Sequence, residues 1–363
     1  MNENTRNLHE LGQSLWLDNI SRELLMNGTL ARYIADWSVT GLTSNPTIFE
    51  HAIGAGSFYD ESIAKLAHRY ESTEALFFAL ALQDLTAAAD LFQPVFKTTD
   101  GIDGWVSLEV SPLLADNAAK TIQAAAELHQ AADRENMFIK IPGTPAGIEA
   151  IEESIFDGVP VNVTLLFSRE QYVAAAEAYL RGLERRLEAG LNLKVASVAS
   201  LFVSRWDVAI ADEVAPSLHN RLGIAIAMRT YRAYRELLAS PRWQRLAGAG
   251  ARPQRLLWAS TGTKDSAASD TLYVEALAAP DTVNTIPEKT LKAFAEHGKV
   301  DVALPVDGGN AEAVLAEFRR AGIDEEALAA RLQKEGADAF SKSWHSLLAC
   351  IEGKRGSLLG RSS

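Results

Sequence analysis

The chain has 363 residues, of which 47% are hydrophobic and 23% charged, a balance typical of a globular protein with a large buried core. Its 35 Lys and Arg against 47 Asp and Glu give a formal net charge of −12, which argues against a broad nucleic-acid or anionic-membrane surface. The single cysteine, Cys350, excludes an intramolecular disulfide and argues against a cysteine-based zinc site.

The start of the chain, Met1-Asn2-Glu3-Asn4, is polar and lacks the apolar core of a secretion signal. We find no apolar run that approaches membrane-spanning length. These two features predict a cytoplasmic protein with no membrane partner.

Eight segments have the alternating or β-branched pattern of strands, and nearly all precede a stretch with helical periodicity. In chain order, the predicted strands are 15–20, 39–44, 105–110, 137–141, 160–167, 194–203, 255–260 and 281–285. Helices are predicted over residues 4–13, 21–36, 47–95 (in two segments) and 205–241. Further helices are predicted to begin at residues 111, 144 and 168 and after residue 285, and a charged helical stretch begins at about residue 310. Residues 353–363 are predicted to be a frayed tail.

The repeated order of strand, cap and helix predicts an α/β fold, a single (β/α)8 TIM barrel over residues 1–363 with extra N- and C-terminal helices. Residues from about 300 to 363 are expected to form a helical extension packed on the barrel. The alternative is an open doubly wound sheet. It is disfavoured because Gly54-Ala55-Gly56 and Gly308-Gly309 do not follow strands as a dinucleotide fingerprint requires, and no phosphate-binding loop is present.

A lysine interrupts the apolar strand that begins at Met137. Side chains alternate along a strand, so Lys140 shares a face with Phe138, close to the end that Pro142-Gly143 closes. An ammonium desolvated there loses its proton readily and becomes an amine nucleophile able to form an imine with a carbonyl. The alternative is a strand-edge lysine whose head group extends into water.

In a barrel one face of each strand points to the axis, and the C-terminal strand ends build the active site. We assign the apolar set to the helix-facing side: Leu15, Leu17, Leu42, Leu108, Val110, Ile139, Ile141, Val161, Val163, Leu165, Leu201, Val203, Leu257 and Ala259. The opposite set, polar apart from one aromatic ring, is then Asp18, Thr43, Asn45, Ser107, Glu109, Lys140, Asn162, Thr164, Ser200, Phe202 and Ser260. Agreement over seven strands predicts a common polar site, although some members have simpler explanations, such as a helix cap at Asn45 or core filling at Ser200.

Asp18 and Glu109 require a partner, since an unpaired buried carboxylate is costly, and Lys140 is the obvious cation. One interpretation is a buried structural ion cluster. The other is imine chemistry, in which one carboxylate deprotonates a substrate hydroxyl and another moves protons through a water during carbinolamine formation and dehydration. This chemistry needs no metal or organic cofactor, and no His pair lies at metal-ligand spacing.

Two cations follow the ends of neighbouring predicted strands. Arg205 lies just beyond 194–203, and Ser260-Thr261-Gly262-Thr263-Lys264 supplies hydroxyls, backbone amides and a second cation beyond 255–260. They provide local positive charge for a substrate phosphate on an acidic protein, or they are ordinary surface turns.

Taken together, five segments resemble the signatures of the transaldolases, class I aldolase-type barrels with an imine lysine on the fourth strand. The matching segments are Trp16-Leu17-Asp18, Gly41-Leu42-Thr43-Ser44-Asn45-Pro46-Thr47-Ile48-Phe49, Ser107-Leu108-Glu109-Val110-Ser111, Ile139-Lys140-Ile141-Pro142-Gly143-Thr144 and Asn162-Val163-Thr164-Leu165-Leu166-Phe167-Ser168. The resemblance implies transfer of a dihydroxyacetone unit from sedoheptulose 7-phosphate to glyceraldehyde 3-phosphate, giving erythrose 4-phosphate and fructose 6-phosphate in the non-oxidative pentose phosphate pathway.

The resemblance also implies roles for the inward residues. Lys140 would form the imine, Asp18 would act as acid and base at the hydroxyl flanking the cleaved bond, and Glu109 with Thr164 would hold the relaying water. The residues expected to bind substrate are Thr43, Asn45, Asn162, Ser200, Phe202, Arg205, Ser260 and Lys264. Expected partners are small sugar phosphates, with no nucleic acid and no membrane, and the protein is expected to be a monomer or homodimer.

One segment departs from the commoner family pattern, in which an arginine after the seventh strand binds phosphate. Here the segment reads Trp258-Ala259-Ser260-Thr261-Gly262-Thr263-Lys264, which resembles a longer bacterial subgroup. Ser260 and Lys264 are therefore predicted to bind the phosphate in place of that arginine. Which of Arg205, Ser260 and Lys264 contributes most to phosphate binding is left open.

Phe202 bears on the reaction class, because an apolar ring cannot orient a water to protonate the enamine as a tyrosine hydroxyl can. This favours a transferase over the alternative of a fructose-6-phosphate-type aldolase, a lyase whose relatives are shorter and tend to carry tyrosine there. A non-catalytic sugar-phosphate-binding barrel is the remaining alternative.

Overall fold

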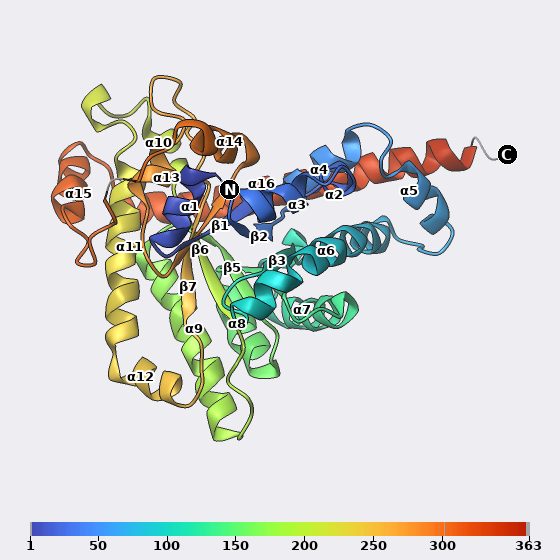
Figure 1. Cartoon of the computed structure of the whole chain (residues 1–363), viewed down its shortest axis with the longest axis horizontal. Helices are drawn as coiled ribbons and strands as arrows, with labels where there is room; N and C mark the ends of the chain where they lie inside the picture. The colour runs from blue at the N-terminus through green and yellow to red at the C-terminus, as the bar shows by residue number, and fades with distance from the viewer. Residues whose placement is uncertain (1, 301, 361–363) are drawn as a thin grey trace.

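The computed structural model describes residues 2–300 and 302–360, and in it eight parallel strands close into a barrel (Figure 1). The strands are β1 (Gln13–Asp18), β2 (Val39–Thr43), β3 (Trp105–Glu109), β4 (Met137–Pro142), β5 (Val161–Leu166), β6 (Ser197–Phe202), β7 (Gln254–Ala259) and β8 (Thr282–Ile286). Each strand pairs with its sequence neighbour, and β1 also pairs with β8. This closure confirms the predicted (β/α)8 barrel and excludes the open sheet.

Helices follow the strands and surround the barrel. Those up to β4 are α1 (Glu3–Glu10), α2 (Arg22–Met26), α3 (Thr29–Asp36), α4 (Pro46–Gly54), α5 (Asp60–Leu66), α6 (Thr73–Thr98), the 3-10 turn η1 (Pro112–Leu114) and α7 (Ala118–Ala132). Those after β4 are α8 (Pro145–Asp157), α9 (Arg169–Glu188), α10 (Ser204–Ile210), the 3-10 turn η2 (Pro216–Leu218), α11 (Leu222–Ala239), α12 (Pro241–Gly248), α13 (Leu272–Ala276), α14 (Glu288–His297), α15 (Ala311–Arg320) and α16 (Glu325–Gly360).

Polar caps fix where many of these helices begin. Asn45 and Thr144 accept backbone N–H groups at the starts of α4 and α8, and Ser168 forms a capping box with Gln171 at the start of α9, so the helices predicted to open at 144 and 168 do begin there. Ser111 does not cap a helix, because Ser111-Pro112 opens only η1, and α7 begins later at the Asn117 cap.

Several predicted boundaries are wrong. The helix expected over 21–36 divides at Gly28, whose φ of 73° lies in the left-handed region that glycine tolerates. The two segments expected over 47–95 are three helices, and the strand expected from 194 begins at Ser197.

The C-terminal tail expected to fray over 353–363 is helical as far as Gly360, and residues 361–363 lie outside the described residues. Figure 1 shows α16 extending along α4 towards α5. Lys354 donates to the Asp60 carboxylate at 2.7 Å, and Arg355 donates to the Ala67 carbonyl at 2.9 Å. These tertiary contacts hold a segment whose composition alone resembles a loose end.

Strand register tests the assignment of inward and outward faces, because paired residues of parallel strands point to the same side. Asp18 pairs with Thr43, and Glu109 with Lys140, which supports the shared inward face. The assignment is wrong on β7: Leu257 pairs with the inward Ser200, so Leu257 and Ala259 face the axis, while Leu256 and Trp258 pack against helices.

Leu165 is a second exception to the predicted alternation. Its φ is 59°, unusual for a residue with a branched side chain, and the pairing of β5 with β6 shifts there. Leu165 therefore joins the cluster that contains Phe202, and Leu166 takes its place among the helix-facing residues.

Helix α6 differs from the expectation that no segment reaches membrane-spanning length. It is long and apolar enough to meet that criterion. Its apolar side chains, including Leu76, Leu80 and Leu85, are buried in the main core, as expected of a core helix on a barrel.

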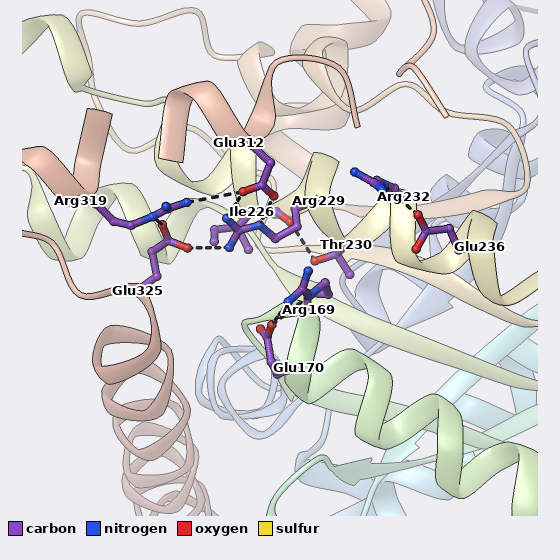
Figure 2. Close-up of polar contacts among 10 residues, drawn as sticks. All are labelled: Arg169, Glu170, Ile226, Arg229, Thr230, Arg232, Glu236, Glu312, Arg319 and Glu325. Atoms are coloured by element: carbon purple, nitrogen blue, oxygen red, sulfur yellow. Dashed lines mark hydrogen bonds and ion pairs between the residues drawn. The ribbon is translucent and has the colours of Figure 1, made fainter. Parts of the chain in front are cut away.

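Salt bridges attach the C-terminal helices to α11 (Figure 2). The Arg229 guanidinium lies 2.6 Å from Glu312 on α15 and 2.6 Å from Glu325 at the start of α16. Arg319 also pairs with Glu325, at 2.9 Å. Because Arg229 is only 13% exposed, these pairs are shielded more than ordinary surface pairs and fix the point at which α16 leaves the barrel wall.

Candidate active site

A cavity of about 160 Å³ opens at the C-terminal ends of the strands. Its lining residues are Asp18, Thr43, Asn45, Lys140, Thr164, Ser200, Phe202, Arg205, Ala259, Ser260, Gly262, Lys264, Thr285, Pro287 and Phe340. The structure thus brings together every predicted site residue except Glu109 and Asn162, which lie beneath the lining and bond to it or to its neighbours.

Lys140 lies at the floor of this cavity with a side chain only 6% exposed. Its Nζ donates to the Ser44 carbonyl at 2.9 Å and lies 3.1 Å from Glu109 Oε2. This burial rules out a head group that extends into water. The lysine therefore presents its nitrogen to the cavity from a fixed, largely desolvated position.

Two carboxyl groups flank the lysine and differ in exposure. Asp18 is half-buried and accepts a hydrogen bond from the Thr43 hydroxyl at 2.7 Å, whereas Glu109 is nearly buried beside Lys140. Burial raises the pKa of the Asp18 carboxyl, against the lowering effects of Lys140 and of the Thr43 hydrogen bond. Burial also raises the pKa of Glu109; Lys140 opposes that rise and the charge of Asp18 adds to it. Raised pKa values suit groups that must take up and return protons.

Thr164 lies at the end of β5, next to the strained Leu165. Its hydroxyl oxygen is buried and has no hydrogen-bond partner among the described residues, whereas Glu109 Oε2 lies 3.1 Å from Lys140 Nζ. Buried polar atoms seldom stay unsatisfied, so the Thr164 hydroxyl in the cavity lining offers a position for a small polar ligand such as a water.

A chain of hydrogen bonds lies beside Lys140. Ser200 donates to Asn162 Oδ1 at 2.7 Å, and Asn162 Nδ2 donates to Ser107 at 3.1 Å. Asn45 caps α4 with its oxygen, accepting from Ile48 at 3.0 Å, and its Nδ2 is not used by the cap. These groups offer donors and acceptors that match the hydroxyls of a small polyol.

The cationic end of the cavity comes from the loops after β6 and β7. Arg205 lies with its Cζ 5.0 Å from the Phe202 ring centre, and Ser260 shares a 2.9 Å hydrogen bond with Ser204. Ser260 has a φ of 56°, which ends the regular strand and turns the chain towards the exposed Lys264. Within residues 2–300 and 302–360, neither Arg205 nor Lys264 has a carboxylate within 4.0 Å.

Sequence reasoning missed two kinds of lining residue. Thr285 is absent from the predicted site, yet it lines the cavity, and its hydroxyl lies 2.5 Å from the Thr43 hydroxyl that donates to Asp18. Phe340 comes from α16, far along the chain, and no local pattern indicates that this helix crosses the barrel mouth. In the described part of the chain, no group of three or more His, Cys, Asp or Glu is positioned to hold a metal ion.

Comparisons with known proteins agree over nearly the whole chain. A family model described as transaldolase/fructose-6-phosphate aldolase matches residues 15–351. A protein named transaldolase from Thiobacillus denitrificans is 45% identical over 355 residues, covering 96% of this chain and 99% of that protein. Proteins with the same name from Parafrankia sp. and Thermobifida fusca are 44% and 45% identical, covering 98% and 94% of this chain and 99% and 95% of their own lengths.

Proposed function

The chain belongs to the transaldolase/fructose-6-phosphate aldolase family, and we propose that it is a transaldolase that transfers a dihydroxyacetone unit through an imine (Schiff base) on Lys140. The observation that carries the proposal is the buried Lys140 amine, 3.1 Å from Glu109, in a cavity that Asp18 also lines. The shared name of the relatives supports the transferase class over the aldolase alternative.

The proposed donor is sedoheptulose 7-phosphate and the proposed acceptor is glyceraldehyde 3-phosphate. Two observations support phosphorylated sugars: the cationic end of the cavity, where Arg205 and Lys264 have no described carboxylate partner, and the amide and hydroxyl groups around Asn162 and Ser200. A monomeric or homodimeric state, a cytoplasmic location and the absence of a cofactor stay predictions.

In the first half-reaction, the Lys140 amine attacks the donor carbonyl, and the carbinolamine loses water to give an iminium. Glu109 and a water held with Thr164 supply and remove the protons of these steps. Asp18 then accepts the proton of the hydroxyl beyond the cleaved C–C bond. The bonding electrons move into the iminium to form an enamine, and erythrose 4-phosphate leaves.

In the second half-reaction, the enamine carbon attacks the aldehyde of glyceraldehyde 3-phosphate, and Asp18 returns its proton to the new alkoxide. Water then hydrolyses the resulting iminium, which releases fructose 6-phosphate and regenerates the Lys140 amine. No net oxidation occurs, because one C–C bond breaks and an equivalent bond forms.

Phe202 supports transfer over simple cleavage. Its ring is 7% exposed, lines the cavity and packs 5.3 Å from the Phe167 ring. An apolar ring at this position offers no hydrogen bond to a water, so the enamine persists until an aldehyde arrives.

A coupled assay with sedoheptulose 7-phosphate, run with and without glyceraldehyde 3-phosphate, tests the proposal. A transaldolase releases erythrose 4-phosphate in quantity only when the acceptor is present. Equal release without the acceptor would favour the aldolase, and no release in either case would favour a non-catalytic sugar-phosphate-binding barrel.

Lys264→Ala is expected to raise KM for glyceraldehyde 3-phosphate about tenfold, the usual effect of losing one hydrogen bond to a charged group, with little change in kcat. Unphosphorylated glyceraldehyde should be affected far less. Lys289→Ala, at an exposed lysine on α14 outside the cavity, is the matched control and should leave both substrates unchanged. Equal losses on both acceptors in Lys264→Ala would remove this lysine from the phosphate site.

A further inference from the structure

One face of α16 lies across the open end of the barrel. Gln333, Gly336 and Phe340 occupy positions i, i+3 and i+7, which share one side of a helix. All three contact groups at the strand ends or in the cavity, although they lie more than 120 residues beyond Arg205 in the sequence.

Gln333 fixes the position of α16 along the barrel mouth. Its Nε2 donates to the Gly143 carbonyl at 3.0 Å, after β4, and to the Leu165 carbonyl at 2.9 Å on β5. Gly143 directly follows the strand that carries Lys140, and Leu165 directly follows Thr164. The two hydrogen bonds therefore fix the position of α16 relative to these two site residues.

Gly336 lies where the helix approaches most closely. A Cβ added there would be 2.9 Å from Leu165 Cδ2 and 3.3 Å from Arg205 Nη1. A glycine in the middle of a helix is normally unfavourable. Here the missing side chain lets α16 lie close to both the Leu165 side chain and the Arg205 guanidinium.

Phe340 completes an aromatic enclosure of Arg205. The Arg205 Cζ lies 5.9 Å from the Phe340 ring centre and 5.0 Å from that of Phe202, both within cation–π range. Phe340 is 5% exposed and lines the same cavity as Lys140. With no carboxylate within 4.0 Å in the described chain, the guanidinium is flanked by two aromatic rings and by α16 at Gly336.

We propose that Phe340 and Gly336 are positioning residues that aim the Arg205 guanidinium at the substrate phosphate, so that α16 sets the preference for phosphorylated over unphosphorylated sugars. This proposal rests on the proposed function for the identity of the phosphate ligand. An arginine that is already oriented loses less side-chain entropy when it binds an oxyanion. Loss of the aromatic enclosure formed by Phe202 and Phe340 therefore weakens phosphate binding but leaves imine formation at Lys140 unchanged.

Phe340→Leu removes the ring and keeps an apolar side chain. We expect KM for glyceraldehyde 3-phosphate to rise about 5- to 30-fold with kcat within about twofold, and KM for glyceraldehyde to stay unchanged. Phe340→Tyr keeps the ring and should restore most of the loss. Gly336→Ala should produce a similar KM increase, because its Cβ would lie 2.9 Å from Leu165 Cδ2 and 3.3 Å from Arg205 Nη1 and would push both side chains from their positions.

Trp344→Leu is the matched control on the same helix. Trp344 is 1% exposed and packs 5.0 Å from Phe77, and it is not one of the two rings over Arg205, so its loss weakens the docking of α16 without removing the enclosure. It should lower the melting temperature and leave the ratio of the two KM values near wild type. If Trp344→Leu changes the ratio as much as Phe340→Leu does, or if Phe340→Leu affects both acceptors equally, the proposal is wrong.

Binding of inorganic phosphate, followed by titration calorimetry on the wild type, Phe340→Leu and Gly336→Ala, separates this proposal from the proposed function. The enclosure predicts weaker phosphate binding in both variants, even if no turnover is found. Unchanged phosphate affinity would overturn the proposal while leaving transaldolase activity intact. Should Phe340→Leu fail to fold, Gly336→Ala provides the same comparison.

Discussion

Lys140→Ala is expected to lower kcat for dihydroxyacetone transfer by about 10⁴-fold or more, the scale seen when a covalent nucleophile is removed. No other lysine lies at the cavity floor among the described residues: Lys264, the other lysine of the lining, is exposed on a loop after β7. The coupled assay with sedoheptulose 7-phosphate and glyceraldehyde 3-phosphate measures this loss.

The same variant should also change how stability depends on pH. Without the ammonium, the pKa of Glu109, already raised by burial, rises further. An acid whose pKa is higher in the folded state binds more protons there, so its stability contribution is present at low pH and is lost as pH rises towards the folded pKa. Melting temperatures of Lys140→Ala should therefore fall from pH 5 to pH 8.

The double variant Lys140→Ala/Glu109→Gln is the control for this effect. It removes the Glu109 carboxylate together with the Lys140 ammonium. Its melting temperature should therefore depend much less on pH over the same range. Loss of the fold at every pH in the single variant, with full rescue in the double variant, would favour the buried structural ion cluster as the main role of this pair.

Asp18→Asn is expected to lower kcat by about 10²- to 10⁴-fold, the usual range for a general acid–base group. The amide cannot accept the proton of the substrate hydroxyl as the C–C bond breaks. Lys140 and Glu109 are untouched, so imine formation with the donor should continue, and reduction with borohydride should still label the protein. Rapid transfer by Asp18→Asn would assign the proton transfer to another group.

Stability should change in the opposite direction to activity in this variant. Since burial raises the pKa of Asp18, the carboxylate contributes less stability as pH rises through its folded-state value. The neutral amide of the variant does not titrate, so the variant does not lose stability in this way as the pH rises. The amide also retains an oxygen that can accept the Thr43 hydrogen bond. The melting temperature at pH 7 should therefore equal or exceed that of the wild type, as expected where an active site is built at the expense of stability.

The barrel and the floor of its site could be predicted because both depend on local patterns. Caps such as Asn45 and Thr144 mark helix starts directly after strands, and alternation along β3 and β4 places Glu109 and Lys140 on one face. In a closed barrel, the ends of neighbouring strands lie close together. The positions of the carboxylates and the lysine along their strands were therefore enough to predict that they meet.

The remainder depends on backbone geometry and distant packing. Leu165 and Ser260 adopt positive φ values, and such breaks reverse or end the alternation on which the inward assignment relies. On β7 both candidate faces are apolar, so Leu257 and Trp258 could not be distinguished by polarity. Phe340 reaches the cavity through the course of α16, which contacts such as Arg229 to Glu325 and Gln333 to Gly143 help to fix across large sequence separations.

Borohydride trapping tests the central claim most directly. The protein would be incubated with fructose 6-phosphate, reduced, digested and mapped by mass spectrometry, with Lys140→Ala treated in parallel. We expect one reduced dihydroxyacetone adduct on Lys140 in the wild type and none in the variant. Labelling of a different lysine, or no labelling of a wild-type protein that turns the substrates over, would contradict the imine mechanism.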